Sequence, residues 1–312
     1  MRLQIEHTTT YDYVPPVSTA QHMAYLIPRE PPTQTVIEAA LSIDPATATR
    51  RDTVDVQGNV RTFFSLPAVH SQLQLHACAT VQTRRLALPA DALQRSPAWE
   101  RVRAHFVYHA GAAWDAATEF TFASAHVQTH PDFADYARAS FTPQRPVLAS
   151  AVDLMHRMHQ DFTYTAQSTD VHTPALTSLA QRRGVCQDFA HILLSCLRTQ
   201  GLAARYVSGY VLTRPPEGQP RLVGSDASHA WVSVYVPDEQ AGQLTGPGRW
   251  VDLDPTNDRW GLHSPGDDYV CLAWGRDFAD VSPLRGVIVG GASHQLSVAV
   301  TVTPSEAPTA LD

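Results

Sequence analysis

The residues best suited to do chemistry in this sequence are a cysteine, a histidine and an aspartate that lie far apart in the chain. The cysteine, Cys186, stands in the stretch GVCQDFAHILL, where a short turn leads into an apolar run that predicts a buried helix ending at Gly201. A helix N-terminus has unpaired backbone N–H groups and a partial positive charge, so a cysteine there is easily deprotonated. A single cysteine is more often a small buried hydrophobe, so a role as nucleophile depends on its partners.

A histidine and an aspartate on two predicted strands supply these partners. His229 begins the alternating stretch HAWVSVYV, and Asp254 ends the stretch RWVDLD, which Pro255 stops. A hairpin that turns near residue 241, in the middle of the intervening loop, places His229 opposite Asp254, with Cβ atoms roughly 5 Å apart. The carboxylate then holds one ring nitrogen of the histidine and leaves the other to take the thiol proton. Asp252 is the alternative carboxylate, and in this register it faces Trp231.

Other side chains near these three are candidates for substrate contact. Trp231, with Trp250 and Tyr235, could line an apolar cleft, although aromatic residues on a strand face more often pack. Asp226, in the loop before the histidine, and Asp188, one turn into the helix, could each select a basic or amine group. A solvated charge is the alternative interpretation of both aspartates.

Composition restricts the kinds of partner and the compartment. The chain has 312 residues, a formal net charge of −7 and a pI of about 6.1, with no run of Lys or Arg, which argues against nucleic acid or an anionic membrane as the main partner. It shows no charged-then-apolar leader and no apolar run that approaches a membrane span. Its four cysteines form neither a disulfide framework nor CxxC spacing. We therefore expect a cytoplasmic protein with reduced thiols. From the three residues described above, we expect it to act on a peptide or protein without a cofactor or metal.

The elements that must position these residues predict an α+β fold in three parts. Residues 1–85 contain period-2 stretches between turns, with Gly58-Asn59 as a hairpin turn, and indicate an antiparallel β-sandwich. Residues 86–145 are predicted to be a mixed helical connector. Residues 146–312 are predicted to be the catalytic core, in which the central Cys186 helix packs on an antiparallel sheet, with further strands at the C-terminus.

At these residues the sequence resembles the bacterial transglutaminase-like proteins of the papain-like cysteine-enzyme superfamily. The matching motifs follow one order along essentially the whole chain: FTYTAQSTDVHTPALTSLAQRRGVCQDFAHILLSCLRTQGLAARYVSGY, GSDASHAWVSVYV, RWVDLDPTN and AWGRDFADVSPLRG. The resemblance implies a transglutaminase-type N-terminal β-domain before a papain-like core, with Cys186 as nucleophile, His229 as general base and acid, and Asp254 as orienting carboxylate. It also suggests that Tyr164 lies near the thiol and helps to bind the oxyanion beside the Cys186 backbone N–H. The sequence departs from papain itself before the cysteine, where Ala180 occupies the neighbourhood of papain's glutamine.

This constellation predicts acyl transfer from an amide. The Cys186 thiolate would attack the carbonyl carbon, and His229 would protonate the departing amine and leave a thioester. With water as the acceptor the enzyme is a peptidase or amidase, and with an amine it is a cross-linking transglutaminase. We expect hydrolysis, because water is always available and nothing in the sequence indicates a dedicated amine site. The alternative from another class is a non-catalytic scaffold that binds a peptide or partner protein.

Overall fold

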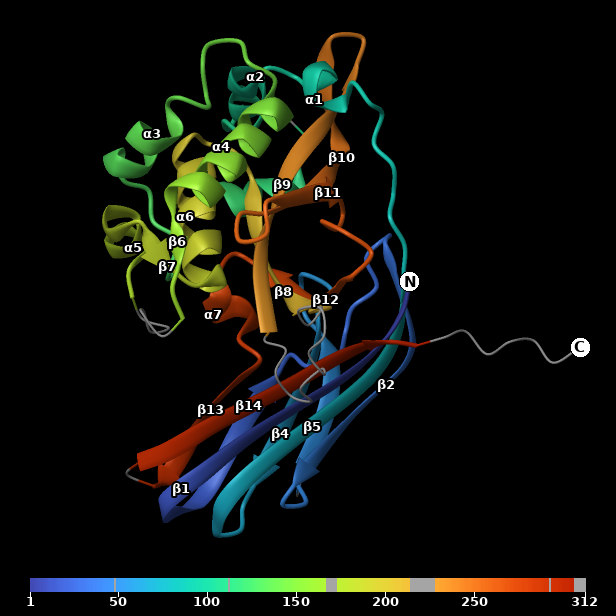
Figure 1. The fold of residues 1–312 in the computed structure, drawn as a ribbon, viewed down its shortest axis with the longest axis vertical. Coiled ribbons are helices and arrows are strands. Elements are labelled where there is room, and N and C mark those ends of the chain that lie inside the picture. Colours follow the sequence, from blue (N-terminus) through green and yellow to red (C-terminus); the bar gives the residue numbers. More distant parts are fainter. Residues whose placement is uncertain (48, 112, 167–172, 214–227, 292, 306–312) are drawn as a thin grey trace, which may run out of the picture.

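The protein consists of a curled antiparallel sheet and, beside it, a body in which helices cover a second antiparallel sheet (Figure 1). The computed structural model describes residues 1–47, 49–111, 113–166, 173–213, 228–291 and 293–305. Within these ranges, no helix has the length and apolar character needed to cross a membrane. The mixture of helices and antiparallel strands confirms the predicted α+β class.

The first sheet is organised around one long strand, β1. Its strands are β1 (Arg2–Ala24), β2 (Gln34–Asp44), β3 (Thr49–Val54), β4 (Val60–Leu66), β5 (His70–Thr83), β13 (Leu284–Gly290) and β14 (Ser293–Pro304). The first half of β1 lies between β5 and β14, and the second half lies between β4 and β13. The inner faces of both halves share an apolar cluster that includes Tyr13, Phe64 and Leu73. The sheet therefore folds over itself and has the two-layered character predicted for this region.

The division of the chain into parts differs from the one that the sequence predicts. The C-terminal strands were expected in the core of residues 146–312, whereas β13 and β14 pair along β1 and complete the first sheet. The helices of the predicted connector, residues 86–145, pack on the helices of the second body. An alternating pattern identifies a strand but does not show which sheet the strand joins, because its pairing partner lies far away in the sequence.

The helices surround α6, the helix that begins at Cys186. The helical elements are α1 (Ala92–Arg95), α2 (Trp99–His105), the 3₁₀ helix η1 (Ala116–Thr121), α3 (Pro131–Ala137), α4 (Val147–Asp161), α5 (Ala175–Gln181), α6 (Cys186–Thr199) and α7 (Phe278–Val281). α6 contacts α3, α4 and α5 on one side and the second sheet on the other. This coverage explains its apolar pattern, since Phe189, Ile192 and Leu193 are all buried.

The second sheet carries the strands that meet the tip of α6. Its order is β11-β10-β9-β8-β12, and a two-stranded parallel pair, β6 and β7, lies beside α5 and α6. The strands are β6 (Thr163–Tyr164), β7 (Arg183–Gly184), β8 (Ala204–Val211), β9 (Ser228–Gln240), β10 (Gln243–Asp254), β11 (Arg259–Leu262) and β12 (Tyr269–Gly275). β9 and β10 form the predicted hairpin, which turns at Ala241 and Gly242, both with positive φ (51° and 80°).

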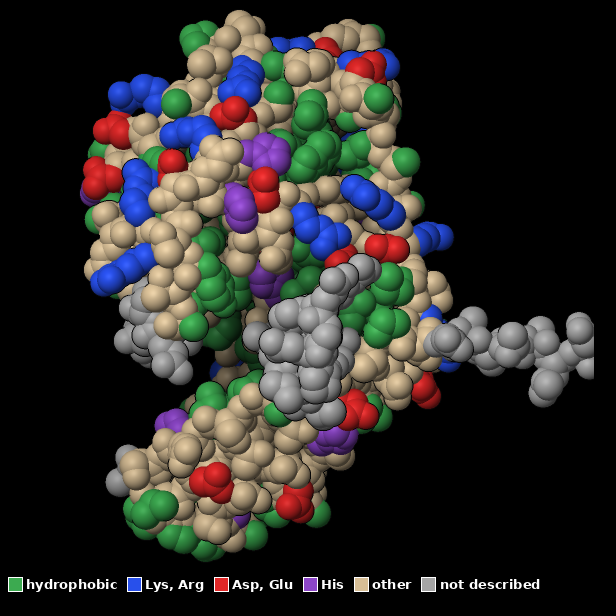
Figure 2. Space-filling view, in the orientation of Figure 1, with side chains coloured by type: hydrophobic (Ala, Val, Ile, Leu, Met, Phe, Trp, Pro, Cys, Tyr) green, Lys and Arg blue, Asp and Glu red, His purple; other side chains and the backbone are tan. Residues whose placement is uncertain are grey.

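The two bodies share one apolar core. Leu3 and Ile5 of β1 and Val300 and Val302 of β14 belong to the same buried cluster as the apolar residues of α4, α6 and the second sheet. Acidic and basic side chains are interspersed over the helical body on the face seen in Figure 2, so this face carries no large patch of one sign. The shared core fixes the second body on the first sheet.

Candidate active site

Cys186 is the first residue of α6, and the turn before it is held by a buried carboxylate. The N-cap residue, Val185, is extended, and its backbone N–H donates to Asp188 Oδ2 at 2.8 Å. Asp188 is only 3% exposed, and Ser178 Oγ donates to its other oxygen at 3.4 Å. The sequence predicted a substrate-selecting or solvated charge at Asp188, whereas this side chain caps the helix. Gly184 is needed next to it, since a Cβ there would lie 2.7 Å from the Cβ of Asp188.

The structure brings Cys186, His229 and Asp254 together. His229 Nε2 lies 2.7 Å from Asp254 Oδ2, and the Cys186 thiol raises the pKa of the same ring. His229 is 8% exposed and Asp254 is fully buried, so their contact is shielded from water. Because the carboxylate engages Nε2, Nδ1 is the ring nitrogen left for the thiol.

The contact between His229 and Asp254 is diagonal across the hairpin rather than directly opposite. Near the turn the strands pair as predicted, but an irregularity in β10 shifts the register by two residues, so that Leu253 pairs with Val232. The predicted pairing is therefore wrong by two positions. A shift of two keeps every side chain on its predicted face, and a diagonal neighbour remains within reach of an imidazole.

In the pair of His229 and Asp254, each residue stabilises the charged form of the other. Burial alone would lower the pKa of His229, but the Asp254 carboxylate and the Cys186 thiol outweigh burial and raise the pKa of His229 to about 10. Burial alone would raise the pKa of Asp254, but His229 and two further donors lower it. At neutral pH the pair is therefore an imidazolium and a carboxylate. An imidazolium is the partner that a nucleophilic thiolate requires.

Two residues that the sequence did not single out hold the carboxylate of Asp254. Tyr269, on β12, donates its hydroxyl to Asp254 Oδ2 at 2.7 Å, and Asn257 Nδ2 donates to the same oxygen at 2.8 Å. The backbone N–H of Thr256 donates to the other oxygen at 2.9 Å. Asn257 follows an Asp-Pro turn, in which a local contact of this kind can be anticipated. Tyr269 carries no such signal, because its strand reaches the site only through the sheet.

Trp231 packs against His229 instead of lining an open cleft. It is 1% exposed, and its ring stacks on the imidazole with centroids 6.0 Å apart and an interplanar angle of 28°. Its indole N–H donates to Asp252 Oδ2 at 2.7 Å. Burial raises the pKa of Asp252 to about 6, against the opposing charge of Arg205. Asp252, the alternative orienting carboxylate, is therefore the anchor of Trp231 and not a partner of His229.

Two tyrosines are influenced electrostatically by the thiol. Tyr164, on β6, is 53% exposed, and burial together with Cys186 raises its pKa. Its predicted place in the oxyanion site stays a prediction. Tyr206, on β8, was not singled out from the sequence; it is 2% exposed, and burial and then Cys186 are the leading causes that raise its pKa. The other predicted substrate contact, Asp226, lies outside the described residues.

The three remaining cysteines have environments unlike that of Cys186. Burial raises the pKa of Cys196, inside α6, and raises the pKa of Cys271 to about 12. Desolvation and the charge of Glu6 raise the pKa of Cys78. All three are poor nucleophiles near neutral pH, because the thiolate is the reactive form.

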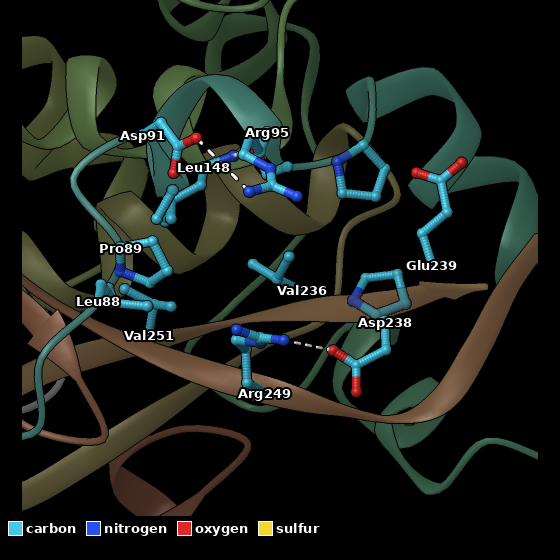
Figure 3. Close-up of a pocket in the computed structure, with 14 residues that line it drawn as sticks. Leu88, Pro89, Asp91, Arg95, Leu148, Val236, Asp238, Glu239, Arg249 and Val251 are labelled. Carbon is cyan, nitrogen blue, oxygen red and sulfur yellow. Dashed lines mark hydrogen bonds and ion pairs between the residues drawn. The ribbon is translucent and has the colours of Figure 1, made fainter. Parts of the chain in front are cut away.

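A cavity of about 460 Å³ lies between α1 and the β9–β10 hairpin (Figure 3). Two ion pairs face each other across it: Arg249 with Asp238 at 2.7 Å, and Arg95 with Asp91 at 3.6 Å. Each of these charges is therefore paired with an opposite charge of the protein itself. None of the three predicted catalytic residues lines the cavity. The cavity is therefore separate from the site at the tip of α6.

The sequence matches two protein-family models and proteins from mycobacteria. Residues 3–82 match the Bacterial transglutaminase-like N-terminal region, and residues 134–255 match the Transglutaminase-like superfamily. The uncharacterized protein Rv2569c of Mycobacterium tuberculosis is 38% identical over 98% of this chain and 93% of its own length. The uncharacterized protein ML0607 of Mycobacterium leprae is 30% identical over 97% of this chain and 98% of its own.

A solved structure shows the same fold. The structure of a candidate cysteine protease from Cytophaga hutchinsonii superposes with a TM-score of 0.70, at 18% identity, and covers 100% of this chain and 94% of its own. Both the curled first sheet and the α6 body are therefore shared with that protein. From the matched regions, the mycobacterial relatives and the common fold, we conclude that the chain belongs to the bacterial transglutaminase-like proteins and has the fold of the papain-like cysteine enzymes.

Proposed function

We propose that the protein transfers an acyl group from an amide through a thioester on Cys186, and that water is its principal acceptor, as in a cysteine protease or amidase. The observation that carries this proposal is the 2.7 Å contact between His229 Nε2 and Asp254 Oδ2, made by a ring whose pKa the Cys186 thiol also raises. The carboxylate fixes the ring so that its second nitrogen exchanges a proton at the thiol.

The reaction proceeds in two halves. The thiolate sulfur of Cys186 bonds to the carbonyl carbon, and the resulting oxyanion accepts hydrogen bonds from the Cys186 backbone N–H and from a tyrosine, for which Tyr164 is the candidate. The C–N bond then breaks as the His229 imidazolium gives its proton to the departing amine. The neutral ring takes a proton from water, whose oxygen attacks the thioester and releases the carboxylic acid and the thiolate.

The choice between water and an amine as acceptor is tested with a glutamine-containing peptide and a labelled primary amine. We expect free acid to form faster than the amine is incorporated, and the Cys186→Ala protein to do neither. The description of the Cytophaga hutchinsonii protein as a candidate cysteine protease supports hydrolysis. Stable incorporation that outpaces acid formation would instead establish a transglutaminase.

A non-catalytic scaffold is distinguished by alkylation. With iodoacetamide at mildly acidic pH, Cys186 should react faster than Cys78, Cys196 and Cys271, since burial or desolvation raises the pKa of each of these three. The His229→Ala variant should lose this advantage. Slow and uniform labelling of all four thiols would favour a scaffold that binds peptide without cleaving it.

A further inference from the structure

The strand β14 forms an edge of the first sheet and is seen at the lower left of Figure 1, where its first half lies away from the helices. It pairs with β1 on one side, and no other described strand pairs with it on the other side. Every residue of the segment 293–299 is exposed. An edge strand presents a row of backbone N–H and C=O groups that can bond to a further strand. This half of β14 is therefore a surface for strand pairing.

The backbone hydrogen bonds show which residues face the free side. Ser305 donates its backbone N–H to the carbonyl oxygen of Arg2 at 2.9 Å, in step with the unshifted register of β1 and β14. In an antiparallel pair, residues that bond to the neighbouring strand alternate with residues whose N–H and C=O groups point away from it. Counting back from Ser305, the odd-numbered residues of β14 bond to β1, and His294, Leu296 and Val298 point these groups outward. No described group forms a hydrogen bond with the outward groups of these three residues.

Other strand edges of the protein are closed by side chains. On β12, the side-chain amide of Gln34 exchanges two hydrogen bonds with the backbone of Cys271, at 3.0 and 2.9 Å. Asn59 does the same for the backbone of Trp274, at 2.8 and 2.9 Å. The edge strand β3 carries three consecutive charged residues at positions 50–52. Covering an edge and charging it are two ways in which proteins prevent edge-to-edge association.

The segment 293–299 has neither protection. Its sequence, SHQLSVA, contains no Lys, Arg, Asp, Glu or Pro, and its register with β1 shows no bulge. Leu296 is 50% exposed and Val298 is 49% exposed, on the same face as Val300, which is buried in the common core. The chain has a net charge of −7, so an uncharged edge is where two copies can approach with little repulsion. These features favour a second copy of the chain as the partner.

We propose that two copies of the chain pair antiparallel through this half of β14, about a twofold axis at Leu296, so that their first sheets become continuous. Hydrogen-bonded pairs need outward-facing groups on both strands, so even-numbered residues must pair with even-numbered residues. An axis at Leu296, the middle of the segment, places this residue opposite its own copy and His294 opposite Val298, which gives about six backbone hydrogen bonds. The contact is isologous, because the same segment serves on both copies, and it therefore closes as a dimer. The exposed Leu296 side chains then meet and are removed from water.

Sedimentation velocity of the full-length protein tests the proposal. We expect a reversible equilibrium of monomer and dimer that moves toward the dimer as the protein concentration rises. Leu296→Lys places two ammonium groups opposite each other at the axis, and it should weaken the association at least about hundredfold. The matched control is Ile37→Lys on β2, another edge strand of the same sheet, where the residue is 49% exposed. This variant should associate as the wild type does.

Two further variants locate the contact independently. The backbone N–H of Val298 points outward, so Val298→Pro should keep the bonds between β1 and β14 and should weaken the dimer. It replaces Leu296→Lys if that variant does not fold. Leu296→Cys should form an intermolecular disulfide on mild oxidation, because the Cα atoms of a hydrogen-bonded antiparallel pair are about 5.5 Å apart. Ile37→Cys should cross-link no faster than the wild type.

Three results would contradict the pairing of β14 with its own copy. A wild-type protein that stays monomeric up to about 0.1 mM would overturn the proposal and would leave the edge to an extended segment of another protein. A dimer whose affinity neither Leu296→Lys nor Val298→Pro lowers would overturn it as well. Cross-linking of Ile37→Cys as fast as that of Leu296→Cys would place the contact elsewhere and would also overturn the proposal.

Discussion

At the scale of single residues, His229 is held by three groups of different chemistry. Asp254 bonds its Nε2, Trp231 stacks on its face, and the ring of Tyr269 lies 6.0 Å away at an angle of 59°. A ring restrained in this way can present its second nitrogen to a thiol without having to be ordered by the substrate. Such preorganisation lowers the entropic cost of reaching the transition state.

The pH dependence of activity should report the pairing of His229 with Asp254. The pKa of His229 is raised to about 10, so the imidazolium that would protonate the departing amine in the proposed reaction is lost as the pH rises through this value. Asp254→Asn removes the charge that raises this pKa, and its alkaline limb should move to lower pH. Activity should fall by about 10²–10⁴-fold at neutral pH. A pH profile of kcat/KM measures both effects, and an unmoved alkaline limb would contradict the assignment.

The same pairing should make stability depend on pH. Because the pKa of His229 is higher in the folded protein than the ordinary value of 6.5, its stabilising contribution is fully present below 6.5 and is lost as the pH rises through about 10. Urea unfolding of the wild type and of His229→Gln across this range should show a decline that is shallower in the variant. Parallel curves would mean that the pair is not formed in solution.

Tyr269 is expected to act as a positioning residue through Asp254. Tyr269→Phe removes a donor that lowers the pKa of Asp254, so the acid limb of kcat/KM should move to higher pH and the rate should fall about tenfold or more. Tyr235→Phe is the matched control, since its hydroxyl bonds Asp115 at 2.9 Å, away from the triad. A loss of rate with an unchanged pH profile in Tyr269→Phe would indicate a merely structural role.

At the scale of elements, the tip of α6 depends on a cap that the chain supplies three residues later. Asp188→Ala removes the acceptor of the Val185 N–H and should destabilise the protein by about 0.5–2 kcal/mol. Asp132→Ala, in the first turn of α3, replaces an exposed aspartate and should change stability by less than about 0.5 kcal/mol. Thermal or urea unfolding compares the two variants.

Faces and element types could be predicted from the sequence, whereas registers and long-range neighbours could not. Alternation in HAWVSVYV and RWVDLD placed His229 and Asp254 on one face of the hairpin, and that face survives the two-residue shift in β10. The shift itself depends on an irregularity that periodicity does not reveal. Tyr269 was not predicted because its approach to Asp254 follows from the order of strands in the sheet. Asp188 was predicted as a substrate-selecting or solvated charge and not as a cap, because burial of a charge follows from packing.

At the scale of the whole molecule, β14 connects the first sheet to the second body. Val300 is fully buried in the common core, whereas Val298, two residues earlier on the same strand, is 49% exposed. Val300→Ala should destabilise the protein by about 1.5–3 kcal/mol, from the loss of two buried methyl groups and the cavity left behind. Val298→Ala should cost less than about 0.5 kcal/mol. If the two variants unfold at similar urea concentrations, the packing of β14 against the second body does not stabilise the protein.

The pairing of β1 with β13 and β14 also makes the first sheet depend on residues that are far apart in the chain. The two strands that cover one edge of β1 come after the whole of the second body. An unpaired strand edge of this length is a template for association with other chains. Removal of β13 and β14 should therefore promote aggregation, although every element around α6 is retained.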